Sequence, residues 1–430
     1  MRKIKYAKFK LQKIVGGGQS LGELESGKKI FVWGGLPDEE VTARITKSKS
    51  SYAEGVVTEV HTRSEKRIWP KDLESYMSTS PWQIMDFNFE QETKANLIKE
   101  AFELHKMSLP NEVEVYTNDQ QFEYRNKVEF SWWWDNDTNT IDLAFFQRGG
   151  RAKIPVQGTS LARPEINKLA FEIRDLLRSK SVDARSLKTI MIRCNQDGQC
   201  VWQLYTKDKL PDIITSDEAA EFSAQGGEVI YSDPLSPASK ITERLTSFGD
   251  IVLVDKILGK PFQYAAESFF QVNIPIYEQA LEDMKKWIAK GNVIDMYSGV
   301  GSIGLTIGGD KATLVEVDQN AHREMLENIK NQKSKAKAVL APSEKALEYI
   351  EKEMTVIVDP PRAGLHADVV DKLLETQPPV IVYLSCNPVT QARDVALLTE
   401  KYEVEFHRGY NFFPRTPHIE NLVVLTAKTK

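Results

Sequence analysis

The feature that most constrains the fold is the run VIDMYSGVGSIGLTIGGDKATLVEVDQNAHREMLENI, which begins at Val293. It contains a short apolar segment, a Gly-rich turn, a helix-like stretch, a second apolar segment ending in acids, and a further helix-like stretch. This order is typical of a βαβ unit, whose two strands are parallel neighbours in a sheet. Residues 263–430 are therefore predicted to form an α/β domain built on a parallel sheet.

The Gly-rich turn indicates a ligand site, although a glycine pattern alone also fits a dinucleotide site or a turn that binds nothing. Gly299 and Gly301 allow the backbone to approach a ligand, and Gly304 allows the following helix to pack closely on the strand. Glu316 follows Asp295 by 21 residues and ends the second strand, where a carboxylate can accept hydrogen bonds from both ribose hydroxyls. The glycines lack the spacing of a dinucleotide-binding GxGxxG turn. They resemble the first motif of S-adenosylmethionine-dependent methyltransferases, and this reading is favoured over dinucleotide binding.

Two further loops follow apolar, strand-like runs. In TVIVDPPRAG the prolines stop the strand and hold Asp359 at its end, although a plain strand-ending turn would read in the same way. Arg362 occupies a position that is usually aromatic in methyltransferases acting on exocyclic amino groups, which argues against that chemistry. Cys386 follows VIVYLS, the next apolar run. Because parallel strands end at one edge, Cys386 and Asp359 are expected in the same crevice.

Cys386 is predicted to be reactive. It precedes an Asn-Pro loop and has Arg393 nearby in sequence, so we expect a partly exposed, electropositive setting rather than an inert packed thiol. A thiolate that adds to carbon 6 of a pyrimidine makes carbon 5 nucleophilic enough to accept a methyl group. A general base must then remove the proton on carbon 5. Glu420 enters an apolar run and is the preferred base, and His418 is the rival, better suited to packing or hydrogen bonding.

Residues 1–62 alternate between polar and apolar residues in short runs separated by Gly and Pro-Asp breaks, which predicts a small β-barrel. Residues 1–70 carry 14 Lys and Arg against 8 Asp and Glu, a net charge of +6. Because the whole chain has a net charge of −5, residues 71–430 carry −11. A polyanion-binding surface and a solvated Lys-rich face explain this charge equally well. The stretch resembles a TRAM domain, an OB-like barrel attached to RNA-modifying enzymes, and that resemblance implies RNA binding.

Residues 63–262 predict a central α+β domain, with alternating strands around 124–150, a helix beginning near Pro164 and a hairpin near residue 197. Cys194 and Cys200 flank the hairpin turn and are expected to pack in strands rather than to bind a metal, so no metal site is predicted. Three cysteines are too few for a disulfide framework. No apolar run reaches membrane-span length and no secretory signal is evident, so a reducing cytoplasm is the expected location.

The blocks DMYSGVGSIG, DPPRAG, SCNPVTQARD and FFPRTPHIE, together with ESFFQVN at residues 267–273, resemble the RNA uracil-5 methyltransferase family. The resemblance covers the whole C-terminal domain and joins it to the barrel. It implies that Cys386 is the nucleophile, that Glu420 removes the proton, and that S-adenosylmethionine is the methyl donor. It also implies that Phe269 stacks on the flipped-out uracil and that Arg125 lies near the substrate. The residues it assigns to the donor pocket are Gln271, Tyr297, Gly299, Gly301, Ser302, Glu316 and Asp359.

The resemblance implies an interrupted layout, in which residues 86–117 pack with the catalytic domain although they precede the central one. The expected substrate is a uridine in structured RNA, ribosomal rather than transfer RNA, and the expected enzyme is a monomer without membrane association. Several relatives hold an iron–sulfur cluster with four cysteines near the barrel, but residues 65–87 here contain none, so no cluster is expected. An RNA cytosine-5 methyltransferase and a non-catalytic RNA-binding protein remain the alternatives.

Overall fold

The computed structural model describes residues 5–288 and 291–428 and divides into two compact units. Unit 1 comprises Met1–Glu90, Gln120–Leu253 and Pro414–Pro417, and unit 2 comprises Gln91–Asp119, Val254–Phe413 and His418–Lys430. The expected barrel and central domain thus lie together in unit 1. Unit 2 begins its main segment at Val254, earlier than the expected domain start at residue 263.

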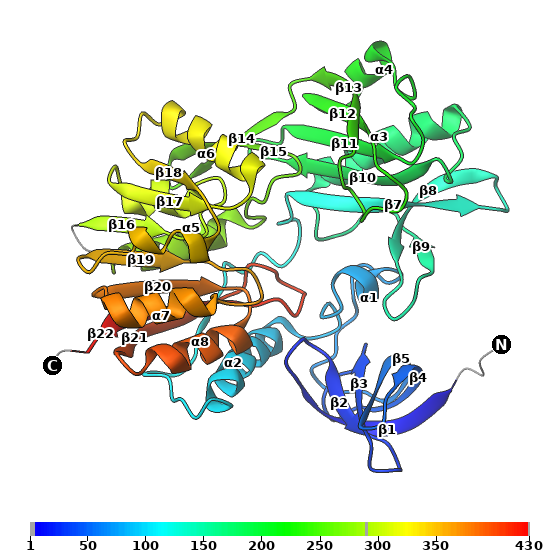
Figure 1. The fold of residues 1–430 in the computed structure, drawn as a ribbon. Coiled ribbons are helices and arrows are strands. Elements are labelled where there is room, and N and C mark those ends of the chain that lie inside the picture. Colours follow the sequence, from blue (N-terminus) through cyan, green and yellow to red (C-terminus); the bar gives the residue numbers. More distant parts are fainter. Residues whose placement is uncertain (1–4, 289–290, 429–430) are drawn as a thin grey trace. The chain divides into compact units, whose positions relative to one another are not determined.

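The N-terminal part of unit 1 is a closed five-stranded barrel (Figure 1), as the alternation of residues 1–62 predicted. Its strands are paired in the order β1 (Tyr6–Ile14), β2 (Ser20–Glu23), β3 (Lys29–Trp33), β5 (Tyr52–Thr62) and β4 (Glu40–Ser48). Alternate residues of each strand point inward, as a pleated strand requires. The buried core consists of Phe9, Leu11, Ile30, Val32, Val41, Ala43 and Ala53.

The cysteine-free stretch after the barrel, which includes the short helix α1 (Tyr76–Thr79), is held by hydrogen bonds and one buried ion pair. Arg67 pairs with Met85 in an isolated β-bridge, so the stretch folds back on itself. The Arg67 side chain donates to both carboxylate oxygens of Glu39, at 2.6 and 2.8 Å, and Glu39 is fully buried. Such bidentate pairs are geometrically specific, so this pair fixes the stretch against the barrel.

The rest of unit 1 is a seven-stranded mixed sheet covered by a helix, which agrees with the predicted α+β domain. Cys194 and Cys200 lie directly opposite each other across a hairpin, both buried in this core, as strand-packing cysteines should be. The helices are α3 (Pro164–Ser179), which packs its apolar face on the sheet, and the one-turn α4 (Ser216–Ala220). In sheet order the strands are β13 (Glu243–Gly249), β12 (Gly226–Tyr231), β11 (Cys200–Thr206), β10 (Leu187–Cys194), β7 (Lys127–Asp135), β8 (Thr140–Phe146) and β9 (Lys153–Pro155).

Unit 2 is built on an eight-stranded sheet flanked by helices (Figure 1), which confirms the predicted α/β class. The strand order is β18 (Lys337–Leu340), β17 (Ala312–Glu316), β16 (Asn292–Asp295), β19 (Met354–Val358), β20 (Val380–Ser385), β22 (Glu420–Ala427), β21 (Tyr402–Tyr410) and β6 (Val115–Tyr116). The five strands from β18 to β20 are parallel, whereas β22 runs antiparallel to both of its neighbours. Strand β6 pairs with β21, so residues that precede the central domain in sequence extend this sheet.

The remaining elements of unit 2 connect these strands. They are α5 (Ile274–Lys285), α6 (Gln319–Asn331), α7 (Ala367–Thr376), α8 (Pro388–Leu398), a π-helix at Gly304–Gly308 and 3₁₀ turns at Ser343–Lys345 and Leu347–Tyr349. A hairpin of β14 (Val252–Ile257) and β15 (Lys260–Ala265) spans the start of the unit, and helix α2 (Phe87–Glu103) begins in unit 1 and continues in unit 2. No helix among the described residues is long and apolar enough to cross a membrane.

Candidate active site

Strand pairing brings Cys386 and Glu420 to the same place. Ser385 at the end of β20 is the partner of Asn421 in the antiparallel strand β22. Extending this register by one residue sets Cys386 opposite Glu420, and opposed residues of an antiparallel pair have Cα atoms about 5 Å apart. Cys386 is half-buried, and the Glu420 side chain is almost entirely buried. The two candidate catalytic residues therefore meet at the carboxyl end of the parallel strands.

Two aspartates lie at the same edge of the sheet. Asp359 directly follows β19, whose last residue Val358 pairs with Tyr383 of β20, and Asp295 ends β16 beside Ile357. Burial, with the charge of Asp295 next, raises the pKa of Asp359 to about 7. Burial also raises the pKa of Asp295 to about 7, although its Oδ2 accepts a hydrogen bond from the Gly304 amide at 3.0 Å. These carboxyl groups, Asp295 buried and Asp359 partly buried, thus lie at the carboxyl ends of neighbouring parallel strands.

The electrostatic setting of Cys386 differs from the expected one. Burial, followed by the carboxylates of Glu420 and Asp359, raises the pKa of the thiol to about 11, and Arg362 opposes this rise. The electropositive setting expected from Arg393 is wrong, because that guanidinium is paired with Asp394 at 2.7 Å. The thiol is therefore protonated at neutral pH, and Arg362 rather than Arg393 is the cation that favours its ionisation.

Glu420 has the properties of a base kept away from water. Burial, followed by the neighbouring charge of Asp359, raises its pKa well above the usual range of a glutamate, while Arg362 lowers it. A carboxylate with a raised pKa binds a proton more strongly, so it is better matched to abstracting one near neutral pH. Arg362 is thus the cation that acts on both Cys386 and Glu420.

Arg362 is fastened to the chain segments that carry both residues. Its Nη2 lies 2.9 Å from His418 Nδ1, and its carbonyl oxygen accepts hydrogen bonds from Asn387 Nδ2 at 2.9 Å and Thr390 Oγ1 at 3.1 Å. A guanidinium can only donate, so His418 Nδ1 must accept and is not available as a base in this arrangement. This contact agrees with the hydrogen-bonding interpretation of His418.

The Gly-rich turn is built around the Glu316 carboxylate. Its Oε2 accepts a hydrogen bond from the Gly299 amide at 2.8 Å, and its Oε1 accepts from the amides of Val317 and Asp318 at 2.8 and 2.7 Å. Gly299 has a φ of 55°, a conformation that favours glycine. At Gly304 a Cβ atom would lie 2.1 Å from Leu314, so this position leaves no room for a side chain. The Gly-rich turn and the Glu316 carboxylate are therefore held in a fixed arrangement by these hydrogen bonds.

Hydroxyl groups line the same turn. Tyr297 and Ser343 are joined through their hydroxyls at 2.9 Å, and the Ser302 hydroxyl lies 2.9 Å from that of Tyr277. Tyr277 was missed by the sequence analysis, since it stands in α5, away from every motif. Among the described residues no group of three or more His, Cys, Asp or Glu side chains is arranged to hold a metal ion.

Comparisons with known proteins identify the family. The tRNA (Uracil-5-)-methyltransferase family model matches residues 343–428, and the TRAM domain model matches residues 16–58. An uncharacterized RNA methyltransferase of Enterococcus faecalis is 30% identical over 435 residues, covering 92% of each chain. This chain belongs to the RNA uracil-5 methyltransferase family. A second relative, from Nitratidesulfovibrio vulgaris, is 28% identical over 452 residues and covers 96% of this methyltransferase and 94% of its own length.

A solved structure shares the fold of this uracil-5 methyltransferase. The Pyrococcus abyssi tRNA (uracil-54, C5)-methyltransferase, in complex with S-adenosyl-L-homocysteine, matches with a TM-score of 0.79 over 97% of this chain and 100% of that one. Sequence identity is 20%, so the likeness concerns the fold. The succession of barrel, central domain and eight-stranded sheet is thus a fold that this solved structure shares.

The structure assembles most, but not all, of the predicted site residues of this methyltransferase in one unit. Phe269 and Gln271 lie in unit 2 between β15 and α5, the first 72% exposed and the second 8% exposed. Arg125 lies in unit 1, where it pairs with Ala162 in an isolated bridge. In the sequence, Arg362 only argued against methylation of exocyclic amino groups. Its influence on both Cys386 and Glu420 depends on the fold and could not be predicted from the sequence.

Proposed function

We propose that this enzyme methylates carbon 5 of a specific uridine in structured RNA through a covalent bond between Cys386 Sγ and carbon 6. The observation that carries the proposal is the register of β20 and β22, which sets Cys386 opposite Glu420. A thiol and a carboxyl group about one strand spacing apart can act on adjacent carbons of a single ring. No other thiol of the chain lies in unit 2, since Cys194 and Cys200 are buried in the core of unit 1.

The donor site that we propose is the Gly-rich turn of unit 2. Glu316 would accept the ribose hydroxyls, the backbone at Gly299 and Gly301 would approach the donor, and Tyr297 and Ser302 would line it. Gln271 and Asp359 complete the proposed set. The absence of space for a side chain at Gly304 fits a turn shaped for close approach. When bound, S-adenosylmethionine supplies an electrophilic methyl group.

We propose the following sequence of bond changes for the reaction of Cys386 and Glu420 with the uracil ring. Cys386 releases its proton to water and forms a bond from Sγ to carbon 6, which moves the π electrons of the 5,6 double bond to carbon 5. Carbon 5 takes the methyl group as the bond from that group to the donor sulfur breaks, which would leave the donor as a neutral thioether, and Glu420 then accepts the proton that carbon 5 carried. The electrons of that C–H bond restore the double bond, and the thiolate leaves carbon 6. Arg362 would favour the ionised forms of both side chains.

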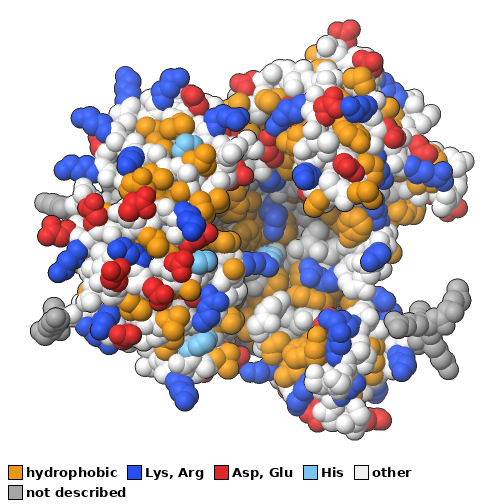
Figure 2. All heavy atoms as spheres, viewed as in Figure 1, with side chains coloured by type: hydrophobic (Ala, Val, Ile, Leu, Met, Phe, Trp, Pro, Cys, Tyr) orange, Lys and Arg blue, Asp and Glu red, His pale blue; other side chains and the backbone are white. Residues whose placement is uncertain are grey.

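The base must leave its stack for Cys386 and Glu420 to reach it. We propose that Phe269, exposed near the edge of unit 2, stacks on the extruded uracil, and that Arg125 contacts the RNA. The barrel would hold the RNA backbone, because residues 1–70 carry 14 Lys and Arg against 8 Asp and Glu, and Lys and Arg side chains lie on the molecular surface (Figure 2). We further propose that the enzyme works without an iron–sulfur cluster and as a monomer.

RNA substituted with 5-fluorouridine tests the proposal. Fluorine on carbon 5 cannot be removed as a proton, so the enzyme and S-adenosylmethionine should form a denaturation-resistant adduct with this RNA. Cys386→Ser should abolish the adduct, whereas Cys194→Ala, which removes a buried thiol of unit 1, should retain it. An adduct only with 5-fluorocytidine RNA would favour cytosine methylation, and reversible binding without an adduct would favour a non-catalytic protein.

The natural RNA requires a separate experiment. We infer ribosomal RNA ahead of transfer RNA, while the matched family model and the Pyrococcus enzyme are named for transfer RNA. Mass spectrometry of 5-methyluridine in both RNA classes, from cells with and without the gene, compares them directly. Loss of the modification from ribosomal RNA alone would support the inference, and loss from transfer RNA alone would overturn it.

A further inference from the structure

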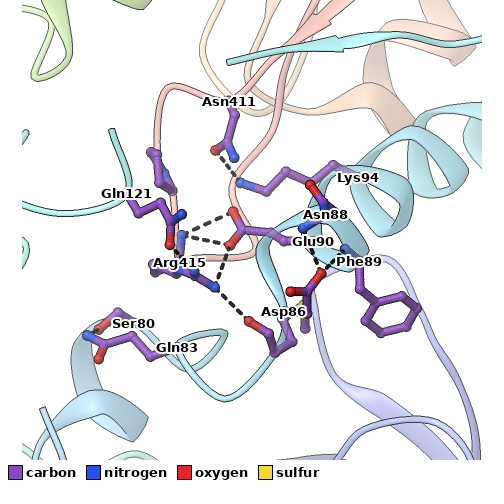
Figure 3. Close-up of polar contacts among 12 residues, drawn as sticks. Ser80, Gln83, Asp86, Asn88, Phe89, Glu90, Lys94, Gln121, Asn411 and Arg415 are labelled. Carbon is purple, nitrogen blue, oxygen red and sulfur yellow. Dashed lines mark hydrogen bonds and ion pairs between the residues drawn. The ribbon is translucent and has the colours of Figure 1, made fainter. Parts of the chain in front are cut away.

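The loop that leads into β22 is anchored by a buried arginine. Arg415 is 3% exposed, has a φ of 66°, and stands five residues before Glu420. Its backbone amide donates to both carboxylate oxygens of Glu90, at 3.0 and 3.1 Å, and its Nη1 lies 3.8 Å from Glu90 Oε2 (Figure 3). The guanidinium also donates to the Met85 carbonyl at 2.6 Å and to the Gln121 side chain. Three residues, Met85, Glu90 and Gln121, therefore hold Arg415.

A second buried charge holds the start of the same loop. Lys94 is fully buried, and its Nζ donates to Asn411 Oδ1 at 2.6 Å and to the Phe413 carbonyl at 3.2 Å. Figure 3 shows Lys94 directed toward Asn411 and Glu90 directed toward Arg415. Glu90 and Lys94 are four residues apart in α2, so they project from the same side of the helix, one turn apart.

The two ends of the loop and its middle belong to different units. Residues 411–413 and the chain from His418 onward count with unit 2, whereas Pro414–Pro417 count with unit 1. Two further bonds hold the middle, from the Tyr124 hydroxyl to the Pro414 carbonyl at 2.9 Å and from the Trp82 amide to the Arg415 carbonyl at 3.2 Å. Burying an ionised side chain is unfavourable unless it is paired, so the contacts of Arg415 with Glu90 and of Lys94 with Asn411 specify the path of the loop.

We propose that Glu90, Lys94 and Arg415 are positioning residues that hold Glu420 where it can take the proton from carbon 5. This inference rests on the proposed function. The three side chains act on the path of the loop rather than on substrate. If the loop shifts, Cys386 can still add to the ring and the methyl group can still be accepted, but removal of the proton is delayed. The enzyme should then remain bonded to methylated RNA.

Trapping on natural RNA tests this proposal. Glu90→Gln keeps the shape of the side chain and removes its charge, and Lys94→Met removes the donor to Asn411. With unmodified uridine and S-adenosylmethionine, both variants should accumulate a denaturation-resistant, methylated enzyme–RNA adduct, as Glu420→Gln should. Release of the product should slow by about tenfold or more, since a general base contributes at least that factor. The rate of adduct formation should change less than twofold by comparison.

A matched variant separates positioning from loss of stability. Glu39→Gln also breaks a buried Arg–Glu pair, with Arg67, but it does so in the barrel. It should lower Tm without trapping the adduct. Should Glu90→Gln fail to fold, Lys94→Met and Asn411→Ser decide the matter. Folded variants that slow adduct formation and product release equally, or that change neither rate, would overturn the proposal.

The same samples distinguish this inference from the proposed function. Adduct formation with 5-fluorouridine RNA needs Cys386 and the donor but no proton removal, so it should persist in every positioning variant. If the native enzyme forms no fluorinated adduct, the covalent mechanism itself fails. If it forms that adduct and the variants trap nothing on natural RNA, only the positioning role fails.

Discussion

Replacing Glu420 by glutamine is expected to make Cys386 react faster with an alkylating reagent. Burial is the largest cause of the raised pKa of this thiol, and the Glu420 charge is the next. Opposed residues of an antiparallel pair have Cα atoms about 5 Å apart, and a unit charge at a distance of that order, with an effective dielectric constant of about 20, contributes about 3 kcal/mol. That energy corresponds to about 2 pKa units and is an upper bound for Glu420→Gln.

The expected rates follow from the thiolate fraction. With a pKa of about 11, about 1% of Cys386 is ionised at pH 9. Because the thiolate is the species that reacts, Glu420→Gln should alkylate at least about tenfold faster in the pH range where Glu420 is ionised in the native enzyme. Arg362→Met should alkylate more slowly, since Arg362 lowers the pKa of the thiol.

Iodoacetamide labelling between pH 7 and 10.5 measures this effect, with the Cys386 peptide quantified by mass spectrometry so that Cys194 and Cys200 do not interfere. Glu375→Gln is the matched control, because this exposed α7 carboxylate pairs with Lys372 and should leave the rate unchanged. A native midpoint near 8.5 that does not respond to Glu420→Gln would refute the view that carboxylates surround the thiol.

Three further outcomes are expected. The raised pKa of Asp359 means that, between about pH 4 and pH 7, the unfolded chain releases a proton that the folded chain retains, so stability should fall as pH rises through this window. Asp359→Asn should flatten this dependence of Tm on pH, and an unchanged slope would contradict it. Gly304→Ala should destabilise the fold by about 1–3 kcal/mol and weaken donor binding, measured by denaturant unfolding and calorimetry, because its Cβ would clash with Leu314. Gly16→Ala, with open space around it, should do neither. The purified enzyme should be active without bound iron, and an iron content near four per chain with activity lost on its removal would contradict the prediction.

Much of the fold follows from local patterns. The alternation in residues 1–62 predicts a barrel, and the Gly-rich turn between two apolar runs predicts a βαβ unit, because both depend on the period of a strand or helix. The motif order also indicates the family and which acid and thiol to examine. The sequence motifs alone indicate Cys386, Glu420 and Glu316 as candidate site residues.

The surroundings of those residues depend on pairing between distant segments. Arg393 precedes Asp394 and pairs with it, so a cation near Cys386 in sequence does not make its setting electropositive. Glu90 and Arg415 meet across 325 positions of the chain, and no local pattern predicts that contact. Composition and periodicity determine which elements form. Sheet register and burial, which arise only when the whole chain packs, decide which charges become neighbours and therefore which pKa values shift.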